Sequence, residues 1–130
     1  MNASDIEIMS PVGSYESLMA AIQGGANAVY FGIGHLNMRS KSSKNFTLDD
    51  LKEISSIAQK NKLRTYITLN TVIYDDELEE MKKIVNAAKE NNITAIIASD
   101  QSVIQYAREM EMEVHMSTQT NITNIAAVKF

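Results

Sequence analysis

The chain has 130 residues, of which 45% are hydrophobic and 22% are charged, a composition typical of one globular domain with its own core. Its 12 Lys and Arg residues against 16 Asp and Glu residues give a net charge of -4. This balance disfavours general binding to nucleic acids or membrane surfaces, because the overall field repels polyanions. The chain contains no Cys, so it forms no disulfide, thiolate metal site or cysteine nucleophile of its own.

The N-terminal stretch "MNASDIEIMS" lacks the basic start and the apolar run of a signal peptide. No run of about eighteen apolar residues, the length that a membrane-spanning helix needs, occurs in the chain. We therefore predict a cytoplasmic protein without membrane contact.

A short apolar run followed by an amphipathic helix pattern recurs along the chain. The predicted strands cover, in chain order, Ile6–Met9, Asn27–Gly32, Arg64–Asn70, Thr94–Ser99 and the stretch "EVHMSTQTN" at Glu113–Asn121. A helix is predicted after each strand, because apolar residues recur at helical spacing and residues that cap helix N-termini precede them. These start signals are Ser14, the capping box "TLDD" at Thr47–Asp50, Asp75 or Asp76, Asp100, and "TNIAAVKF" near the end of the sequence.

The alternation of strands and helices predicts parallel strand pairing. Two architectures fit this alternation, an open doubly wound sheet and a (β/α) barrel. An open sheet that binds a dinucleotide would carry a Gly-rich turn before its first helix. The segment "SPVGSYES" has a single glycine, and the "GIG" after the second strand is not followed directly by a helix. The sequence therefore gives weak support to a dinucleotide site.

Polar side chains on one face of two predicted strands favour the barrel. A strand covered by helices on both faces would be apolar nearly throughout. We therefore predict a partial TIM-like (β/α) barrel of about five parallel units in sequential order, with helices on the outer side only and the polar faces inside. Those faces carry Tyr66, Thr68 and Asn70 in the third strand, and His115, Ser117 and Gln119 in the fifth.

The chain resembles the N-terminal part of the collagenase-like peptidase family, peptidase family U-32, in the segments "MSPVGSYESLMAAIQGGANAVYFG", "MRSKSSKNFT", "YITLNT", "ASDQSVI" and "HMSTQTNITNIAAVKF". The resemblance implies a barrel-like domain within a longer protein. It also implies either a collagen-degrading peptidase or an enzyme for oxygen-independent hydroxylation of RNA bases or of a quinone precursor. In the hydroxylating branch later cysteines hold an iron-sulfur cluster, so no cofactor is expected in this chain. The family's downstream cluster of Glu, His and Cys has no counterpart here.

The helical pattern continues to Phe130 without a stop signal. Five βα units cannot close the usual eight-stranded barrel. We therefore interpret residues 1–130 as the truncated N-terminal half-barrel segment of a larger domain. Its open side would expose strand edges and apolar helix surface. We expect a two-fold homo-oligomer that covers this side and buries roughly 1,000 Å² or more.

Two residues are candidates for catalytic roles, each with a structural alternative. His115 could act as a general acid or base, or it could be a hydrogen-bonded interior histidine. No second histidine stands at ligand spacing, so no metal site is predicted. Asp100 ends the fourth strand, where barrel enzymes place catalytic carboxylates. It also directly precedes a helix, and we favour the interpretation that it is an N-cap.

Five residues are predicted to bind substrate: Asn37, Arg39, Asn70, Ser117 and Gln119. Arg39 and Asn37 lie in the long loop "GHLNMRSKSSKNF", where Arg39 could bind a carboxylate or phosphate in a bidentate manner. A solvated charged loop is the alternative. Asn70 ends the third strand and could instead satisfy backbone groups of a turn. Ser117 and Gln119 are predicted to line the barrel interior.

The resemblance implies that the chain is the substrate-binding part of a collagenase-like peptidase, a hydrolase whose chemistry is completed by residues outside this chain. One alternative is part of an oxygen-independent hydroxylase acting on RNA bases, including those of tRNA, or on a quinone precursor. Another is a non-catalytic binding or assembly module. The substrate of the whole protein would then be a peptide or RNA. Ser117 and His115 stand two residues apart and do not form a catalytic triad, so the isolated chain is expected to be inactive.

Overall fold

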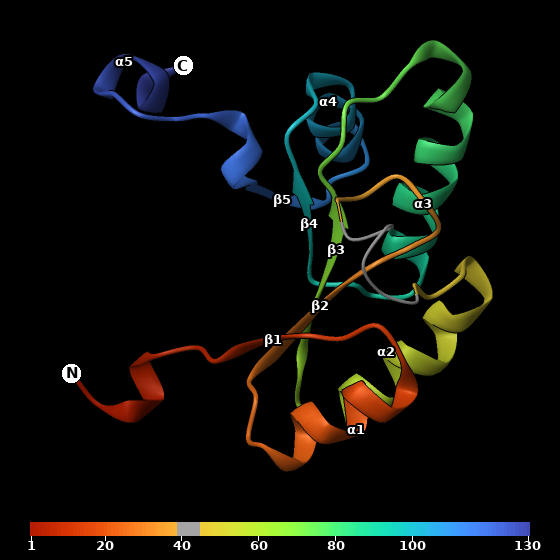
Figure 1. Cartoon of the computed structure of the whole chain (residues 1–130), viewed down its shortest axis with the longest axis vertical. Helices are drawn as coiled ribbons and strands as arrows, with labels where there is room; N and C mark the ends of the chain where they lie inside the picture. Colours follow the sequence, from red (N-terminus) through yellow and green to blue (C-terminus); the bar gives the residue numbers. More distant parts are fainter. Residues whose placement is uncertain (39–44) are drawn as a thin grey trace.

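The computed structural model describes residues 1–38 and 45–130, and these residues form a five-stranded sheet in which all pairings are parallel (Figure 1). The strands lie side by side in the order β1-β2-β3-β4-β5. This result confirms the predicted sequential order. Their bounds are Met9–Pro11 for β1, Ala28–Gly32 for β2, Arg64–Leu69 for β3, Ala95–Ala98 for β4 and Glu113–Met116 for β5.

The described residues contain five α-helices, one after each strand. The first begins after Ser14, whose side chain accepts a hydrogen bond from the Ser17 N–H, and this confirms the predicted N-cap. The α-helices are Tyr15–Gln23 for α1, Leu51–Lys60 for α2, Leu78–Glu90 for α3, Gln101–Glu109 for α4 and Ile125–Lys129 for α5. Short 3-10 turns occur at Ala3–Asp5 (η1), Leu48–Asp50 (η2), Asp75–Glu77 (η3) and Thr118–Thr120 (η4).

Helices α1 to α4 cover one face of the sheet, which we call the outer face. The main hydrophobic core joins strand residues such as Phe31, Ile67 and Ile96 to helix residues such as Leu18 and Val85. Since alternate residues of a strand point to opposite faces, this core takes every second residue of the inner strands. Burial of these side chains is the main force that holds the helices on the sheet.

The opposite, inner face of the sheet carries a much smaller buried cluster formed by Ala28, Tyr66 and Ala95. The α1 to α4 residues of the core lie on the outer side alone, as predicted, and the fold is part of a (β/α) barrel. Helix α5 differs from the other four, because none of its residues is buried. Figure 1 shows α5 and the N-terminal segment at the left of the view, away from α3.

The first strand begins later than predicted. Strand β1 starts at Met9 rather than at Ile6, because the Ile6 N–H closes the turn η1 by donating to the Ala3 carbonyl at 3.2 Å. The Ile8 N–H then donates to the side-chain Oδ1 of Asn27 at 2.8 Å. The Asn27 side chain thus replaces a backbone acceptor for this N–H, while the Ile8 carbonyl already accepts from the backbone N–H groups of Asn27 and Ala28.

The fifth strand ends earlier than predicted, at Met116, so the prediction of a strand over Glu113–Asn121 was wrong beyond that residue. The Ser117 hydroxyl accepts a hydrogen bond from the Gln119 N–H at 3.3 Å, and Thr120 Oγ1 donates to the Ser117 carbonyl. Such local side-chain bonds compete with strand pairing. They turn the chain into η4 after Ser117, so Gln119 does not continue the strand face that carries His115.

Replacing Phe31 by Ala tests the outer core. The Phe31 ring is fully buried and packs edge-on against the Phe46 ring, with 5.5 Å between ring centroids. We expect Phe31→Ala to lower the free energy of unfolding by about 3–5 kcal/mol in urea denaturation. Phe130→Ala is the matched control, because Phe130 is exposed, and it should change stability by less than about 0.5 kcal/mol. Equal effects of the two substitutions would contradict the assigned core.

Candidate functional site

Two of the predicted substrate-binding residues, Asn70 and Ser117, contact each other at the carboxyl end of the sheet, and a third, Asn37, directly precedes a residue that contacts Asn70. Asn70 directly follows β3, and its Oδ1 accepts a hydrogen bond from the Met38 N–H at 3.1 Å. Its Nδ2 donates to the Ser117 hydroxyl at 3.5 Å. Asn70 therefore links the segment after β2, which contains Asn37, to the residue that follows β5.

The backbone of Asn70 takes part in the same arrangement. Its carbonyl accepts a hydrogen bond from the Ser99 hydroxyl, which follows β4, at 3.0 Å. The neighbouring Thr71 hydroxyl is buried and has no hydrogen-bond partner among the residues that the structure describes. Chain segments after four consecutive strands thus present neutral amide and hydroxyl groups at one end of the sheet. We call Asn37, Asn70, Ser99 and Ser117 the amide-hydroxyl cluster.

Asn37 is almost fully buried, with 1% of its surface exposed. Its amide donates to the carbonyl oxygens of Ile33 at 3.5 Å and Gly34 at 3.4 Å. A Cβ atom on Gly32 would overlap the Asn37 side chain. Gly32 is therefore required for the close approach of this amide, and the "GIG" segment has a packing function that the sequence did not indicate.

Ser117 is buried, with 6% of its surface exposed, whereas Gln119 is exposed on η4. The sequence placed both on one strand face, but only Ser117 contacts Asn70. The predicted anion-binding residue Arg39, with Lys41 and Lys44 beside it, lies outside the described residues. The substrate-binding roles of these residues remain predictions.

Asp100 begins α4 as its N-cap, as the favoured interpretation predicted. Its Oδ1 accepts hydrogen bonds from the Ser102 N–H at 2.8 Å and the Ser102 hydroxyl at 2.6 Å. Its Oδ2 accepts from the Ile73 N–H at 3.0 Å, which ties the segment after β3 to α4. Burial opposes ionisation of this carboxyl, but the hydrogen bonds from Ser102 and Ile73 outweigh burial and lower the pKa of Asp100. A catalytic role of Asp100 remains a prediction.

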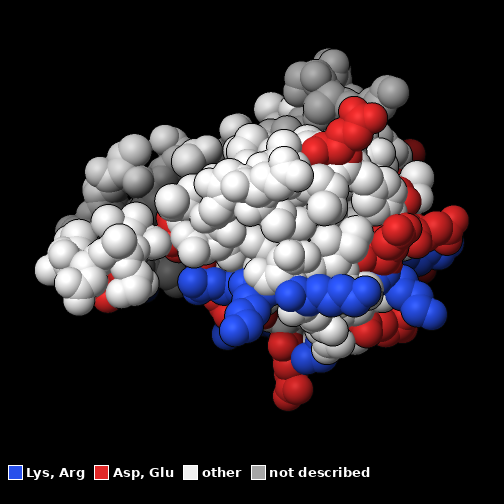
Figure 2. All heavy atoms as spheres, turned by 90° about the horizontal axis from the view of Figure 1, so that it is seen from below, with Lys and Arg blue, Asp and Glu red and all other residues white. Residues whose placement is uncertain are grey.

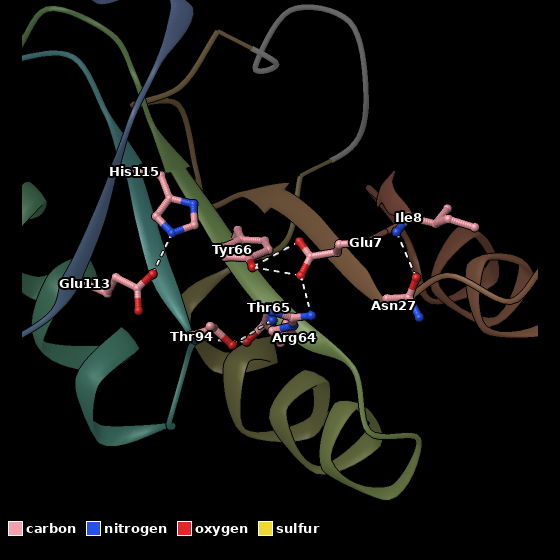
Figure 3. Close-up of polar contacts among 9 residues, drawn as sticks. All are labelled: Glu7, Ile8, Asn27, Arg64, Thr65, Tyr66, Thr94, Glu113 and His115. Atoms are coloured by element: carbon pink, nitrogen blue, oxygen red, sulfur yellow. Dashed lines mark hydrogen bonds and ion pairs between the residues drawn. The ribbon is translucent and has the colours of Figure 1, made fainter. Parts of the chain in front are cut away.

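A second polar group lies on the inner face, nearer the amino ends of the strands (Figure 3). The Tyr66 hydroxyl donates to the carboxylate of Glu7, at 3.1 Å from Oε1, and Arg64 Nη2 lies 2.8 Å from Glu7 Oε2. Burial, together with the hydrogen bond to Glu7 and its negative charge, raises the pKa of Tyr66. The N-terminal segment is thereby attached to β3 across the inner face.

His115 stands beside this group. Its ring centroid is 5.0 Å from that of Tyr66, and its Nε2 lies 2.7 Å from Oε1 of Glu113 (Figure 3). His115 therefore has the hydrogen-bonded environment that the structural alternative predicted, although it is only partly buried. Its catalytic role remains a prediction.

Four residues of these two groups were not predicted from the sequence: Glu7, Arg64, Ser99 and Glu113. The period-two pattern of β3 places Arg64 on the face of Tyr66 and could have indicated this residue. No local pattern indicates Glu7, because its partner Tyr66 is 59 residues away in the chain.

Among residues 1–38 and 45–130, no group of three or more His, Cys, Asp or Glu side chains is arranged to hold a metal ion. The same residues include no helix with the length and apolar character needed to cross a membrane.

Comparison with known proteins gives a family match and several named relatives. The sequence profile of peptidase family U32 matches residues 13–130. A collagenase of Porphyromonas gingivalis is 53% identical over the whole chain, which covers 31% of that relative. The tRNA hydroxylation protein P1 of Bacillus subtilis is 31% identical over 95% of the chain and 30% of its own length. The 23S rRNA 5-hydroxycytidine C2501 synthase of Escherichia coli is 30% identical over 96% of the chain and 19% of its own length.

The chain thus spans about a third, or less, of the length of these relatives. Among solved structures, a xylose isomerase domain protein from Planctomyces limnophilus matches with a TM-score of 0.53 and 14% identity. The match covers 85% of this chain and 51% of that one. At this identity the likeness concerns the fold alone.

Replacing Asp100 by Asn tests the cap and its charge. The folded-state pKa of Asp100 is lowered, so its ionisation stabilises the fold above the unfolded-state pKa of about 3.9. That contribution is lost as the pH falls through the still lower folded-state pKa. We expect Asp100→Asn to cost about 1–2 kcal/mol at neutral pH, with a difference from the wild type that shrinks below about pH 4.

Urea denaturation across this pH range measures the effect. Asp49→Asn is the control, since Asp49 is exposed in η2. A difference between wild type and Asp100→Asn that stays constant with pH would contradict the stabilising role of the Asp100 charge.

Proposed function

Because this chain belongs to peptidase family U32, we propose that it supplies the substrate-binding part of the protein's active site and that groups outside its 130 residues complete the chemistry. The observation that carries the proposal is the amide-hydroxyl cluster around Asn70. In (β/α) barrels substrates bind at the carboxyl ends of the strands. The cluster lies at this end and offers neutral donors and acceptors, which suit an uncharged polar group.

The first candidate activity is peptide cleavage. It is supported by the 53% identity to the Porphyromonas gingivalis collagenase. A peptide backbone alternates N–H donors and C=O acceptors. The side chains of Asn70 and Ser117 could bind such groups by replacing their mutual 3.5 Å contact.

The described residues do not form a nucleophile-base pair at this site. The Ser117 hydroxyl accepts from the Gln119 N–H and contacts Asn70, while His115 contacts Glu113 on its own strand. A hydrolase needs a nucleophile, a base within hydrogen-bond reach and a group that stabilises the oxyanion. This part of the protein therefore acts in binding, and bond cleavage requires groups from elsewhere.

The second candidate activity is hydroxylation of an RNA base, which a neutral cluster suits as well as it suits a peptide group. Asn side chains can donate to and accept from a base edge at the same time, and two of the relatives are named for tRNA or rRNA hydroxylation.

The surface charge adds little to RNA binding on one face of the molecule. Figure 2 shows a row of Lys and Arg side chains bordered by Asp and Glu side chains on the face seen from below. On that face the attraction for phosphates is offset by neighbouring carboxylates.

A hydroxylating protein of this kind would use an iron-sulfur cluster. Such clusters are held by Cys thiolates, and this chain has no Cys. The chain therefore has no thiolate ligand for an iron-sulfur cluster. Any cysteines that hold such a cluster would belong to another part of the protein.

We expect the purified 130-residue chain to release no fragments from gelatin or collagen peptides above background. The reason is the missing nucleophile-base pair among the described residues. Release of dye from labelled gelatin is a suitable assay. Cleavage that disappears in Ser117→Ala or His115→Ala would contradict the proposal, because it would place a working catalytic group in this chain.

A binding experiment distinguishes the two substrate classes. Fluorescence anisotropy would compare a labelled collagen-like peptide with a labelled single-stranded RNA loop. Asn70→Ala should weaken binding of the correct class about tenfold, since it removes hydrogen bonds at the site. Asn61→Ala is the matched control, because Asn61 is exposed at the end of α2.

The melting curve of each variant shows whether it is folded. Peptide binding that depends on Asn70 supports the first candidate, and RNA binding that depends on Asn70 supports the second. Failure of both probes to bind the folded wild-type chain would contradict the proposed binding role.

A further inference from the structure

The turn that follows β3, at Asn70–Ile73, carries the central side chain of the amide-hydroxyl cluster. Two consecutive residues that follow β4 hold this turn at its two ends. The Ser99 hydroxyl donates to the Asn70 carbonyl at 3.0 Å, and Asp100 Oδ2 accepts from the Ile73 N–H at 3.0 Å. The partners are 29 and 27 residues apart in the chain, so the turn depends on contacts that only the fold provides.

The two carboxylate oxygens of Asp100 have different partners. Oδ1 caps α4 by accepting from the N–H and the hydroxyl of Ser102, whereas Oδ2 accepts from Ile73. An N-cap needs a single side-chain oxygen, as the Ser14 hydroxyl shows at the start of α1. Helix α4 therefore does not require the second oxygen of Asp100. Its bond to the turn is strong for a hydrogen bond, because the acceptor is charged.

The turn also contains a buried group that its contacts leave unsatisfied. The Thr71 hydroxyl oxygen is buried and lacks a hydrogen-bond partner within residues 1–38 and 45–130. Burial of a hydroxyl without a partner costs free energy. The bonds from Ser99 and Asp100 offset this cost and keep the turn in place.

The position of the turn decides where the Asn70 side chain lies. Asn70 begins the turn, and its side chain contacts two other segments at once, with the Met38 N–H at 3.1 Å from Oδ1 and the Ser117 hydroxyl at 3.5 Å from Nδ2. A group that binds substrate has to be held within about 0.5 Å of its productive position by the residues around it. The contacts of Ser99 and Asp100 with the turn are suited to this task.

We propose that Ser99 and Asp100 are positioning residues, which hold the turn Asn70–Ile73 against the cost of the unpaired Thr71 hydroxyl and so orient the Asn70 side chain toward the substrate. This inference rests on the proposed binding role of the amide-hydroxyl cluster. It gives Asp100 a role beyond the N-cap of α4. Both residues act through Asn70 and need no contact with the substrate.

Three variants separate the turn from the cap. Asp100→Ser keeps one oxygen for the N-cap and has no second oxygen for Ile73, and Ser99→Ala removes the bond to the Asn70 carbonyl. Each should weaken binding of the labelled collagen-like peptide or the labelled RNA loop about tenfold in fluorescence anisotropy. Ser102→Ala is the matched control and should leave the affinity unchanged, because it removes a hydroxyl contact of Asp100 but not the bond to Ile73.

Nitrogen–proton NMR spectra of the unliganded chain give a readout that does not depend on either probe. Asp100→Ser and Ser99→Ala should shift the side-chain amide resonances of Asn70 more than Ser102→Ala does. Ser99→Thr keeps the hydroxyl and should restore both the wild-type resonances and the wild-type affinity. A role in stability alone would lower the melting temperature without these changes. Circular dichroism shows whether each variant is folded.

Replacing Thr71 by Val tests the cost of the turn. The substitution removes an unpaired hydroxyl and keeps the shape of the side chain, so Thr71→Val should unfold at a higher urea concentration than the wild type. Thr65→Val is the matched control on β3. The buried Thr65 hydroxyl accepts from the Thr94 N–H at 3.3 Å, so this variant should unfold at a lower urea concentration.

The outcomes distinguish this inference from the proposed function. Failure of the wild-type chain to bind either probe would contradict the proposed function, and the Asn70 resonances would still decide the positioning role. Folded Asp100→Ser and Ser99→Ala variants with wild-type Asn70 resonances would overturn the inference. A Thr71→Val variant that is less stable than the wild type would contradict the cost at which the turn is held.

Discussion

Helices α1 to α4 cover a single face of the parallel sheet, and this arrangement decides the chemical character of both faces. The outer face must then be apolar, as the buried side chains of Phe31, Ile67 and Ile96 show. The inner face has no such requirement and can carry polar groups at no cost to the core. Both the amide-hydroxyl cluster and the Glu7–Tyr66 contact use this freedom. The position of the site thus follows from the way the sheet is covered.

The structural features that depend on residues close together in the chain could be predicted from the sequence. The order of the strands and the caps at Ser14 and Asp100 follow from periodicity and from side chains next to helix starts. Contacts between distant segments were not predictable in this way. Glu7 reaches Tyr66 through the fold, and Gly32 is required by the later residue Asn37. The end of β5 was missed because the alternating pattern continues through Ser117, although its hydroxyl bonds locally and turns the chain.

The two polar groups of the inner face differ in charge and therefore in what they can do. Toward the amino ends of the strands, Arg64 forms an ion pair with Glu7, and the carboxylate of Glu113 contacts the His115 ring, so the charged groups there have partners within the chain. Toward the carboxyl ends, the cluster around Asn70 is neutral. A neutral site of this kind recognises hydrogen-bonding pattern and shape more than charge. That property is common to a peptide group and to a nucleobase, and relatives of the chain are named for activity on each kind of polymer.

We propose that substrate binds at the carboxyl ends of the strands, against Asn70 and Ser117 and next to the segment that contains Asn37. Nitrogen–proton NMR correlation spectra of the labelled chain test it directly, because side-chain amides give their own resonances. On titration with the collagen-like peptide or the RNA loop, we predict that the largest shifts occur at the Asn37 and Asn70 side-chain amides and at the Ser117 backbone amide. Shifts confined to helices α1 to α4 would instead place the binding surface on the outer face and contradict binding at the carboxyl ends of the strands.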